Sequence, residues 1–343
     1  EKRPVAGSQS SGTLTISQTD FKLADNSTLT SDEALNFVNL NLNDYALTLG
    51  SSTSDLTVQN DITFDVSTEG ISTGEADLVL YGALTISDGK LKSTSGKISL
   101  QEGVEISGTG ELDFDNSTGN STLELADDFS SSGSLNISGT VLTLTNNITL
   151  TSVQALNFVT LNLNLYTLTL GSSDSDLTVQ NAITIFQNNE GISTGDADLI
   201  LNESQNISGQ GSITSTGGII SLQEGGELFG SGILDISGSI WTLGGNFEKS
   251  GGTTLTMSGT NLVLDNNSTL TSNEALSFDN LTLNNFTLTL GDNSSDLTVQ
   301  NAITIDKLNE GISTGDADLI LNESQNISGQ GSITSTGGII SLQ

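Results

Sequence analysis

Apolar and polar residues alternate along most of the chain, in short runs between turn residues. In 40-LNLNDYALTLG-50, leucines alternate with Asn and Thr. A period of two is typical of β-strands, and no long segment has the 3.6-residue period of a helix. We therefore expect an all-β protein with essentially no helix. Strands expected in the middle of the chain are 142–145, 161–164, 167–171, 177–180, 182–186, 198–202, 219–223 and 233–236.

The pattern returns about every 120 residues. The tetrapeptide 34-ALNF-37 recurs as 155-ALNF-158 and 275-ALSF-278, steps of 158 − 37 = 121 and 278 − 158 = 120 residues. Segment 309–343 is identical to segment 189–223. Such self-similarity is the signature of repeat architectures. The expected organisation is an irregular tail 1–12 followed by one continuous β-solenoid 13–343, built of repeats 26–146, 147–266 and a truncated 267–343.

Many short strands with regular turns suit a sandwich, a barrel or a solenoid. A unit repeated head to tail is open-ended, whereas sandwiches and barrels are closed, and only 4% of the residues are aromatic. These features favour a parallel β-helix. With roughly 20–25 residues per coil, each repeat makes about five to six coils. Asn at the turns is expected to stack on Asn of the next coil.

Two kinds of aromatic residue stand out. Phe37, Phe158 and Phe278 occupy one place in every repeat, which predicts an interior stack. Trp241 occurs in one repeat only. We interpret it as a partly buried residue, with a platform for stacking carbohydrate as the alternative.

The charge balance excludes some classes of partner. The chain has 41 acidic and 8 basic residues, a net charge of −33, and no Cys or His. Phosphates are held by Lys and Arg, so we expect no nucleic-acid partner. No apolar run approaches the roughly 18 residues of a membrane span, so direct membrane insertion is not expected. The absence of Cys excludes disulfides and thiol chemistry.

Acidic residues two positions apart are the candidates for metal binding or catalysis. Residues that alternate in a strand share a face, so such pairs offer oxygen ligands for Ca²⁺ or the two carboxylates of a glycoside hydrolase. One pair recurs in each repeat, including as Glu75/Asp77, which favours a scaffold role over catalysis. The alternative to Ca²⁺ is solvated carboxylates that block edge pairing. The candidate Ca²⁺ ligands are Asp113, Asp115, Asp196, Asp198, Asp316 and Asp318.

Two further activities remain as alternatives. Many β-helix proteins are polysaccharide lyases or glycoside hydrolases, but no Lys recurs in all the copies and the one Arg is Arg3, so no enzyme activity is expected. Ice binding is suggested by T-x-T triplets, although their spacing is uneven and Thr is a common outward strand residue. The triplets lie at 149–151, 167–169, 254–256, 269–271 and 287–289.

The motif 106-ISGTGELDF-114 returns as 207-ISGQGSI-213, 228-LFGSGIL-234 and 327-ISGQGSI-333. It resembles the strand–turn–strand signature of large secreted bacterial β-helix proteins, the autotransporter passengers and filamentous-haemagglutinin-like adhesins. The resemblance implies a right-handed parallel β-helix at the cell surface and carries over no functional residue.

From repeats and resemblance together we expect an extracellular structural or adhesive protein: a rod-like stalk, sheath or matrix subunit, and a piece of a larger surface protein. No cofactor is expected apart from the possible Ca²⁺. The expected partners are other copies, through the solenoid ends or faces, and surface polysaccharide. A polysaccharide-binding or polysaccharide-degrading β-helix is the alternative.

Overall fold

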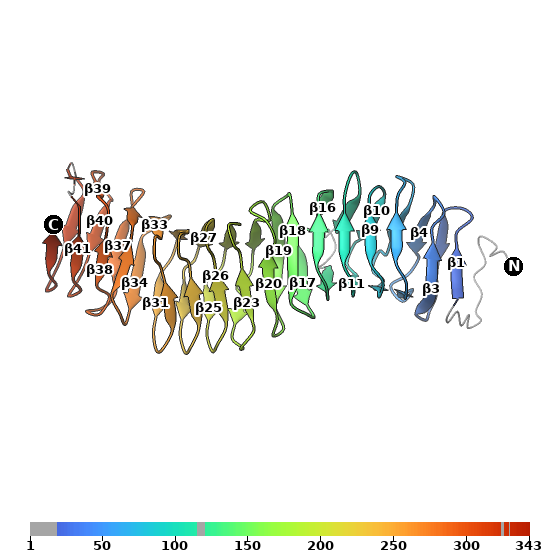
Figure 1. The fold of residues 1–343 in the computed structure, drawn as a ribbon, viewed down its shortest axis with the longest axis horizontal. Helices are drawn as coiled ribbons and strands as arrows, with labels where there is room; N and C mark the ends of the chain where they lie inside the picture. The colour runs from blue at the N-terminus through green and yellow to red at the C-terminus, as the bar shows by residue number, and fades with distance from the viewer. Residues whose placement is uncertain (1–18, 115–120, 324–325, 329) are drawn as a thin grey trace. The chain divides into compact units, whose positions relative to one another are not determined.

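The computed structural model describes residues 19–114, 121–323, 326–328 and 330–343. Every regular element in these ranges is a β-strand, which confirms the all-β prediction (Figure 1). The tail 1–12 and the candidate ligand Asp115 lie outside the described residues. The chain divides into two compact units, Glu1–Val159 and Thr160–Gln343, and β19 (Leu156–Asn162) crosses their boundary.

The first unit is a solenoid of three parallel sheets. The chain passes through the three sheets in turn and returns one coil later, so Leu78 in one coil pairs with Ile98 in the next. The first sheet contains β1 (Thr19–Lys22), β3 (Leu35–Asn41), β5 (Leu56–Val58), β8 (Leu78–Leu80), β11 (Lys97–Leu100), β14 (Thr122–Leu125) and β17 (Thr140–Leu144). The second contains β6 (Ile62–Phe64), β9 (Leu84–Ile86), β12 (Val104–Ile106), β15 (Phe129–Ser131) and β18 (Ile148–Ser152). The third contains β2 (Ser27–Leu29), β4 (Ala46–Leu49), β7 (Gly70–Ser72), β10 (Lys90–Ser93), β13 (Glu111–Phe114) and β16 (Ser134–Asn136).

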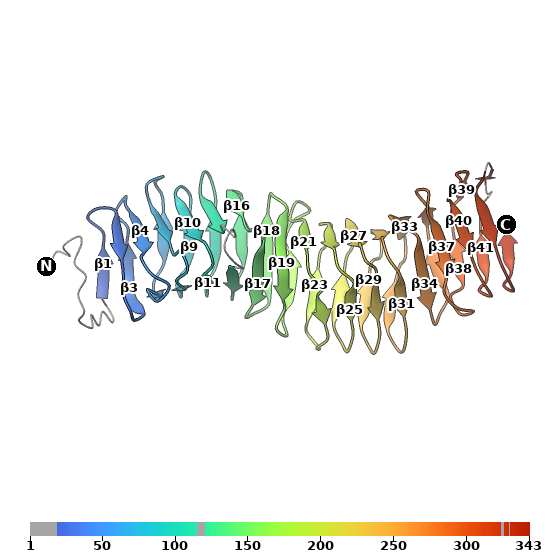
Figure 2. The same cartoon turned by 180° about the vertical axis from the view of Figure 1, so that it is seen from behind.

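The second unit is built the same way, and Figure 2 shows its coils from behind. One face contains β21 (Leu177–Val179), β24 (Leu199–Leu201), β27 (Ile219–Leu222), β30 (Ile240–Leu243), β33 (Asn261–Leu264) and β36 (Asn280–Thr282). A second contains β22 (Thr184–Ile185), β25 (Gln205–Ile207), β28 (Gly226–Leu228), β31 (Phe247–Lys249), β34 (Ser268–Ser272), β37 (Thr287–Leu290), β40 (Gly311–Ser313) and β43 (Ser332–Thr334). A third contains β20 (Thr167–Leu170), β23 (Gly191–Ser193), β26 (Ser212–Thr214), β29 (Ile233–Asp235) and β32 (Thr254–Thr256). Two further sheets are β35 (Leu276–Phe278), β38 (Leu297–Val299), β41 (Leu319–Leu321) and β44 (Ile340–Leu342), and β39 (Thr304–Ile305) with β42 (Asn326–Ile327).

Six coils and a step in the strand register fall within the first repeat. Within repeat 26–146 the first sheet has the strands β3, β5, β8, β11, β14 and β17, at the upper end of the expected five to six coils. At the ALNF motif the chain changes its partner: Leu35–Phe37 pair with the following coil, and Asn39–Asn41 pair with the preceding one. In the second unit the same step separates β35 from β36. The sequence pattern did not predict this register step.

The interior is filled by Leu, Ile, Val and Phe that alternate with outward polar residues. Phe37, Phe158 and Phe278 are no more than 1% exposed, which confirms the expected interior position. Trp241 corrects our interpretation, because it is fully buried rather than partly buried. Its ring packs edge-on against Phe247 at a centroid distance of 4.9 Å, so it offers no platform for a carbohydrate.

Candidate functional site between successive coils

Each repeat carries one glutamate that sequence reasoning missed, immediately before the recurrent GISTG: Glu69, Glu190 and Glu310. In the last copy, Glu310 Oε1 accepts the backbone N–H of Asn285 at 3.2 Å. Its Oε2 accepts the N–H groups of Asp306 at 3.0 Å and Lys307 at 3.2 Å. The carboxylate therefore joins a turn of one coil to a turn of the next, and we call this arrangement the glutamate clamp.

The clamp is repeated with the same geometry in the first copy. Glu69 Oε1 accepts the N–H of Asp44 at 3.1 Å, and its Oε2 accepts the N–H of Asp65 at 2.9 Å. Glu69 is 8% exposed and Glu310 is 6% exposed. A buried carboxylate needs such donors, since removing a charge from water without compensation is costly.

The second copy completes the series. Glu190 Oε1 accepts the N–H of Leu165 at 3.1 Å, and its Oε2 accepts the N–H groups of Phe186 and Gln187, both at 2.8 Å. The clamped turn has two successive residues with positive φ, Asn164 at 51° and Leu165 at 75°. The equivalent residues of the other copies have φ within a few degrees of these values. In each copy it is the second residue of this left-handed pair whose N–H donates to the carboxylate.

The clamp shifts the acidity of its carboxylate. Burial by itself raises the pKa of Glu310, but the N–H groups of Asp306, Asn285 and Lys307 and the Lys307 charge outweigh it. The pKa falls from 4.5 to about 2. For Glu190, burial likewise opposes the N–H groups of Gln187, Phe186 and Leu165, and the pKa is lowered. Hydrogen bonds to a carboxylate favour its charged form, so both clamps are ionised at neutral pH.

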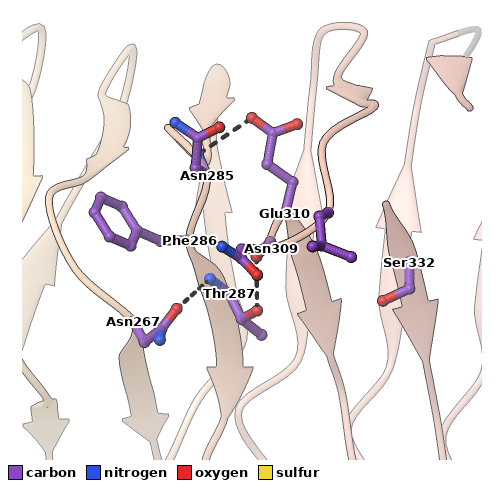
Figure 3. Close-up of a pocket in the computed structure, with 8 residues that line it drawn as sticks. Asn267, Asn285, Phe286, Thr287, Asn309, Glu310 and Ser332 are labelled. Atoms are coloured by element: carbon purple, nitrogen blue, oxygen red, sulfur yellow. Dashed lines mark hydrogen bonds between the residues drawn. The ribbon is translucent and has the colours of Figure 1, made fainter. Parts of the chain in front are cut away.

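Shallow polar hollows lie beside the clamps. A hollow of about 390 Å³ at Glu310 is shown in Figure 3. Asn267 Oδ1 accepts the N–H of Thr287 at 2.8 Å, and Thr287 Oγ1 donates to the carbonyl of Asn309 at 3.1 Å. Phe286 also lines this hollow, and Tyr45 and Tyr166 occupy its position in the other copies. A second hollow, of about 690 Å³, is lined by Glu69 and several Asp and Asn residues.

The paired carboxylates of the repeats lie in turns, which corrects their predicted place in a strand. Asp196 and Asp198 precede β24, and Asp316 and Asp318 precede β41. Asp198 Oδ1 accepts the N–H of Ile219 in the next coil at 2.7 Å, and Asp318 Oδ1 accepts that of Ile339 at 2.7 Å. Glu75 and Asp77 also lie in the turn before β8. Asp198 and Asp318 therefore connect successive coils.

Asp113 is not a solvated carboxylate. It is 5% exposed and lies 2.6 Å from Lys90 Nζ and 3.8 Å from Lys92 Nζ. It also accepts a hydrogen bond from Asn136 Nδ2 at 2.6 Å. Burial by itself lowers the pKa of Lys90. The hydrogen bonds and negative charges of Asp113 and Glu111 outweigh burial, so the pKa of Lys90 is raised. Across the described part of the chain, no three side chains of His, Cys, Asp or Glu form a group that could hold a metal ion.

Asparagines make ladders between coils, as expected for Asn at the turns, but Asn39, Asn261 and Asn280 of these ladders lie in strands. Asn280 Nδ2 donates to Asn261 Oδ1, and Asn301 Nδ2 donates to Asn280 Oδ1 at 3.1 Å. In the first unit Asn60 Nδ2 donates to Asn39 Oδ1 at 2.8 Å. Each amide donates to the preceding coil and accepts from the following coil, so the ladder continues for as many coils as have Asn at this position.

Comparison with protein-family models, with curated proteins and with solved structures finds no match to the chain. Within the described ranges, no helix has the length and apolar character needed to cross a membrane.

Proposed function

We propose that the chain is a structural segment of an extracellular surface protein, serving as a stalk, sheath or matrix subunit. The proposal follows the resemblance to autotransporter passengers and filamentous-haemagglutinin-like adhesins. The observation that carries it is the use of the repeated carboxylates. Glu310, Asp198 and Asp318 each accept backbone N–H groups from a neighbouring coil, which is a scaffold role. Stability in such a protein is a sum over neighbouring coils, which suits an extended spacer.

Turnover of polysaccharide is the test of this proposal. The purified chain is incubated with a panel of acidic and neutral polysaccharides, and new reducing ends and unsaturated products are measured. If the chain is a structural segment, we expect no product from any of the polysaccharides. Release of product from any polysaccharide, lost on Asp196→Asn or Asp198→Asn, would overturn the structural proposal in favour of a hydrolase or lyase.

Self-association between copies is part of the proposal. Apolar side chains are exposed on the faces of the solenoid, such as Val153 at 58% and Leu308 at 70%. Exposed apolar side chains offer contacts to another copy. Light scattering at rising concentration should show growing particles. Leu308→Lys should reduce the growth, and a strictly monomeric chain at high concentration would contradict self-association.

Binding of polysaccharide without turnover is a second candidate. It is favoured by an aromatic residue that is partly exposed at the same place in each copy, Tyr45, Tyr166 or Phe286. In the last copy Phe286 borders a polar hollow. Sugars bind where an aromatic face lies beside polar groups. Binding to a glycan panel should weaken on Phe286→Ala. The matched control is Phe229→Ala, since Phe229 is 36% exposed and does not line this hollow.

Ice binding gains no support from the strand register. Thr269 pairs with Thr289, but Thr271 pairs with Glu248 and Thr287 pairs with Gly311. The triplets therefore form no continuous threonine array. Ca²⁺ at the six candidate aspartates remains a proposal, to be tested by titration of the chain with the ion in a calorimeter.

A further inference from the structure

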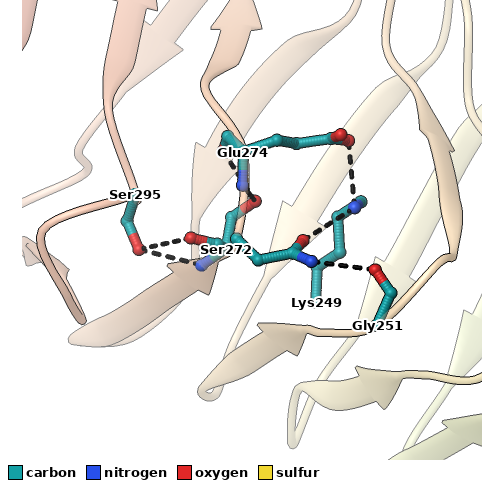
Figure 4. A network of polar contacts seen from close by, with 6 residues as sticks. Lys249, Gly251, Ser272, Glu274 and Ser295 are labelled. Carbon is teal, nitrogen blue, oxygen red and sulfur yellow. Dashed lines mark hydrogen bonds and ion pairs between the residues drawn. The ribbon is translucent and has the colours of Figure 1, made fainter.

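A lysine is buried in the second unit beside an amide and a carboxylate. Lys249, at the end of β31, is 2% exposed. Its Nζ donates to Asn273 Oδ1 at 3.0 Å and lies 3.0 Å from Glu274 Oε1. Figure 4 shows the Lys249 amine and the Glu274 carboxylate facing each other across neighbouring coils. Lys249 is the buried member of the group, since Asn273 is exposed and the Glu274 side chain is 53% exposed.

The surrounding hydrogen bonds hold the amide in one orientation. Asn273 Nδ2 donates to the carbonyl of Gly251 at 2.8 Å, so its Oδ1 is the atom that faces the lysine. A lysine ammonium can only donate and a backbone carbonyl can only accept, which fixes the assignment of the two amide atoms. The backbone beside it is also held, because Ser272 Oγ donates to the carbonyl of Glu274 at 2.7 Å. The electrophilic carbon, the amine and the carboxylate are therefore pre-positioned.

The fold itself does not require this cluster. The first unit makes the same pairing between β15 and β18, where Ser131 pairs with Ser152 as Lys249 pairs with Ser272. Val153 and Gln154 there occupy the places of Asn273 and Glu274. In the first copy Asp32 and Glu33 hold these places, and the coil before them lies outside the described residues. Lys, Asn and Glu thus occur together in the last copy and are all three replaced in the second. A buried charge is costly to retain for stability alone, and this joint change points to chemistry between the three groups.

We propose that Lys249 and Asn273 form an intramolecular isopeptide bond, with Glu274 as the catalytic residue. Glu274 takes a proton from the Lys249 ammonium, and the free amine attacks Asn273 Cγ. The Nζ–Cγ bond forms and the Cγ–Nδ2 bond breaks. Glu274 returns its proton to the departing nitrogen, the second proton that Nζ loses passes to the same nitrogen, and this nitrogen leaves as ammonium. An ammonium and a primary amide become a secondary amide and an ammonium ion, so no oxidant or other reactant is needed.

The product would tie two neighbouring coils together covalently. Lys249 and Asn273 are 24 residues apart in the sequence, so the bond closes a loop of one coil. Such a loop would resist separation of the coils by force or by denaturant, since a cross-link restricts the unfolded chain. The inference stands on this cluster alone and does not depend on the proposed surface function.

Mass spectrometry of the full chain tests the proposal. After denaturation the intact mass should fall below the sequence mass by one ammonia. A lysine-specific protease should leave Lys249 uncut, and a second cut at Asp265, which lies between the two residues, should release a branched peptide that joins Lys249 to Asn273. A succinimide at an asparagine loses the same mass without joining two peptides, so the branched peptide is the deciding observation.

Variants separate the three roles. Lys249→Arg keeps the charge without a nucleophilic amine, and Glu274→Gln removes the base at a half-exposed position; both should restore the full mass. Asn273→Asp should form the same amide with loss of water. Lys307→Arg is the matched control, because Lys307 lies 3.4 Å from Glu310 and the mass deficit should persist. An unmodified wild-type mass with normal cleavage at Lys249, or a deficit that survives Lys249→Arg, would overturn the proposal.

Discussion

Glu310 Oε1 accepts the backbone N–H of Asn285, which lies 25 residues earlier in the chain, at 3.2 Å. The same bond joins Glu69 to Asp44 and Glu190 to Leu165. One side chain per repeat therefore satisfies backbone donors that the strand ladder leaves open. Backbone donors without a partner are costly when buried, so the clamp stabilises the turn beside the register step.

Replacing the clamp carboxylate should loosen this turn. Glu310→Gln keeps the shape but places an amide donor against N–H groups, and we expect a local loss of about 1.5–3 kcal/mol, the range for hydrogen bonds to a charged group. Amide hydrogen exchange should accelerate at Asn285 and Asp306. The exposed Glu248→Gln is the control and should leave both rates unchanged. Equal exchange in the two variants would contradict the role of the clamp.

The clamp also predicts a dependence on pH. The pKa of Glu310 is lowered from 4.5 to about 2, so its contribution is complete above 4.5 and is lost as the pH falls toward 2. Urea unfolding of the wild type and Glu310→Gln should differ by a constant amount from neutral pH down to about 5. The difference should then shrink on further acidification. A difference that is independent of pH across this window would show that the charge is not what stabilises the turn.

Leu165 should be a point of strain. Its φ is 75° and its side chain is 54% exposed, whereas Asp44 and Asn285 hold the equivalent place in the other copies. Leucine disfavours the left-handed region, and Asn tolerates it. Leu165→Asn should raise the free energy of unfolding by about 1 kcal/mol. Leu308→Asn, which also removes an exposed leucine but at a residue outside the positive-φ set, should leave it within about 0.5 kcal/mol.

Two glycines should respond differently to the same change. Gly195 and Gly225 both have positive φ, at 57° and 79°. A Cβ added at Gly195 meets nothing within 4 Å, whereas one at Gly225 would overlap the carbonyl oxygen of Asn246 in the next coil. Gly225→Ala should therefore destabilise the chain by more than Gly195→Ala, whose cost is the backbone conformation alone. Thermal unfolding of both variants measures the difference, and equal losses would contradict the close approach of the coils.

The single tryptophan reports on the interior. Trp241 is fully buried against Phe247 and Phe278, so its fluorescence should be blue-shifted and resistant to quenching by iodide until the coils unfold. Trp241→Ala should cost about 3–5 kcal/mol, because it leaves a cavity in a packed core. The exposed Tyr81→Ala should cost less than about 1 kcal/mol. Quenching of native Trp241 would show that it lies at the surface.

The sequence by itself determined the strands, the parallel coils and the interior residues, because a period of two sets which side chains point inward and neighbouring coils need only local contacts. It indicated the phenylalanine position, since Phe37, Phe158 and Phe278 recur in step. The right-handed twist, the surface location and the function remain predictions.

Only the tertiary structure decided what the polar residues contact. The glutamate clamp joins turns about 25 residues apart, and alternation carries no information about which turns of successive coils face each other. The sequence shows a recurring Glu before GISTG, but it does not show which backbone N–H groups that Glu accepts. The burial of Trp241 and Lys249 and the register step at ALNF were hidden for the same reason: each depends on the stacking of coils that are distant in the chain.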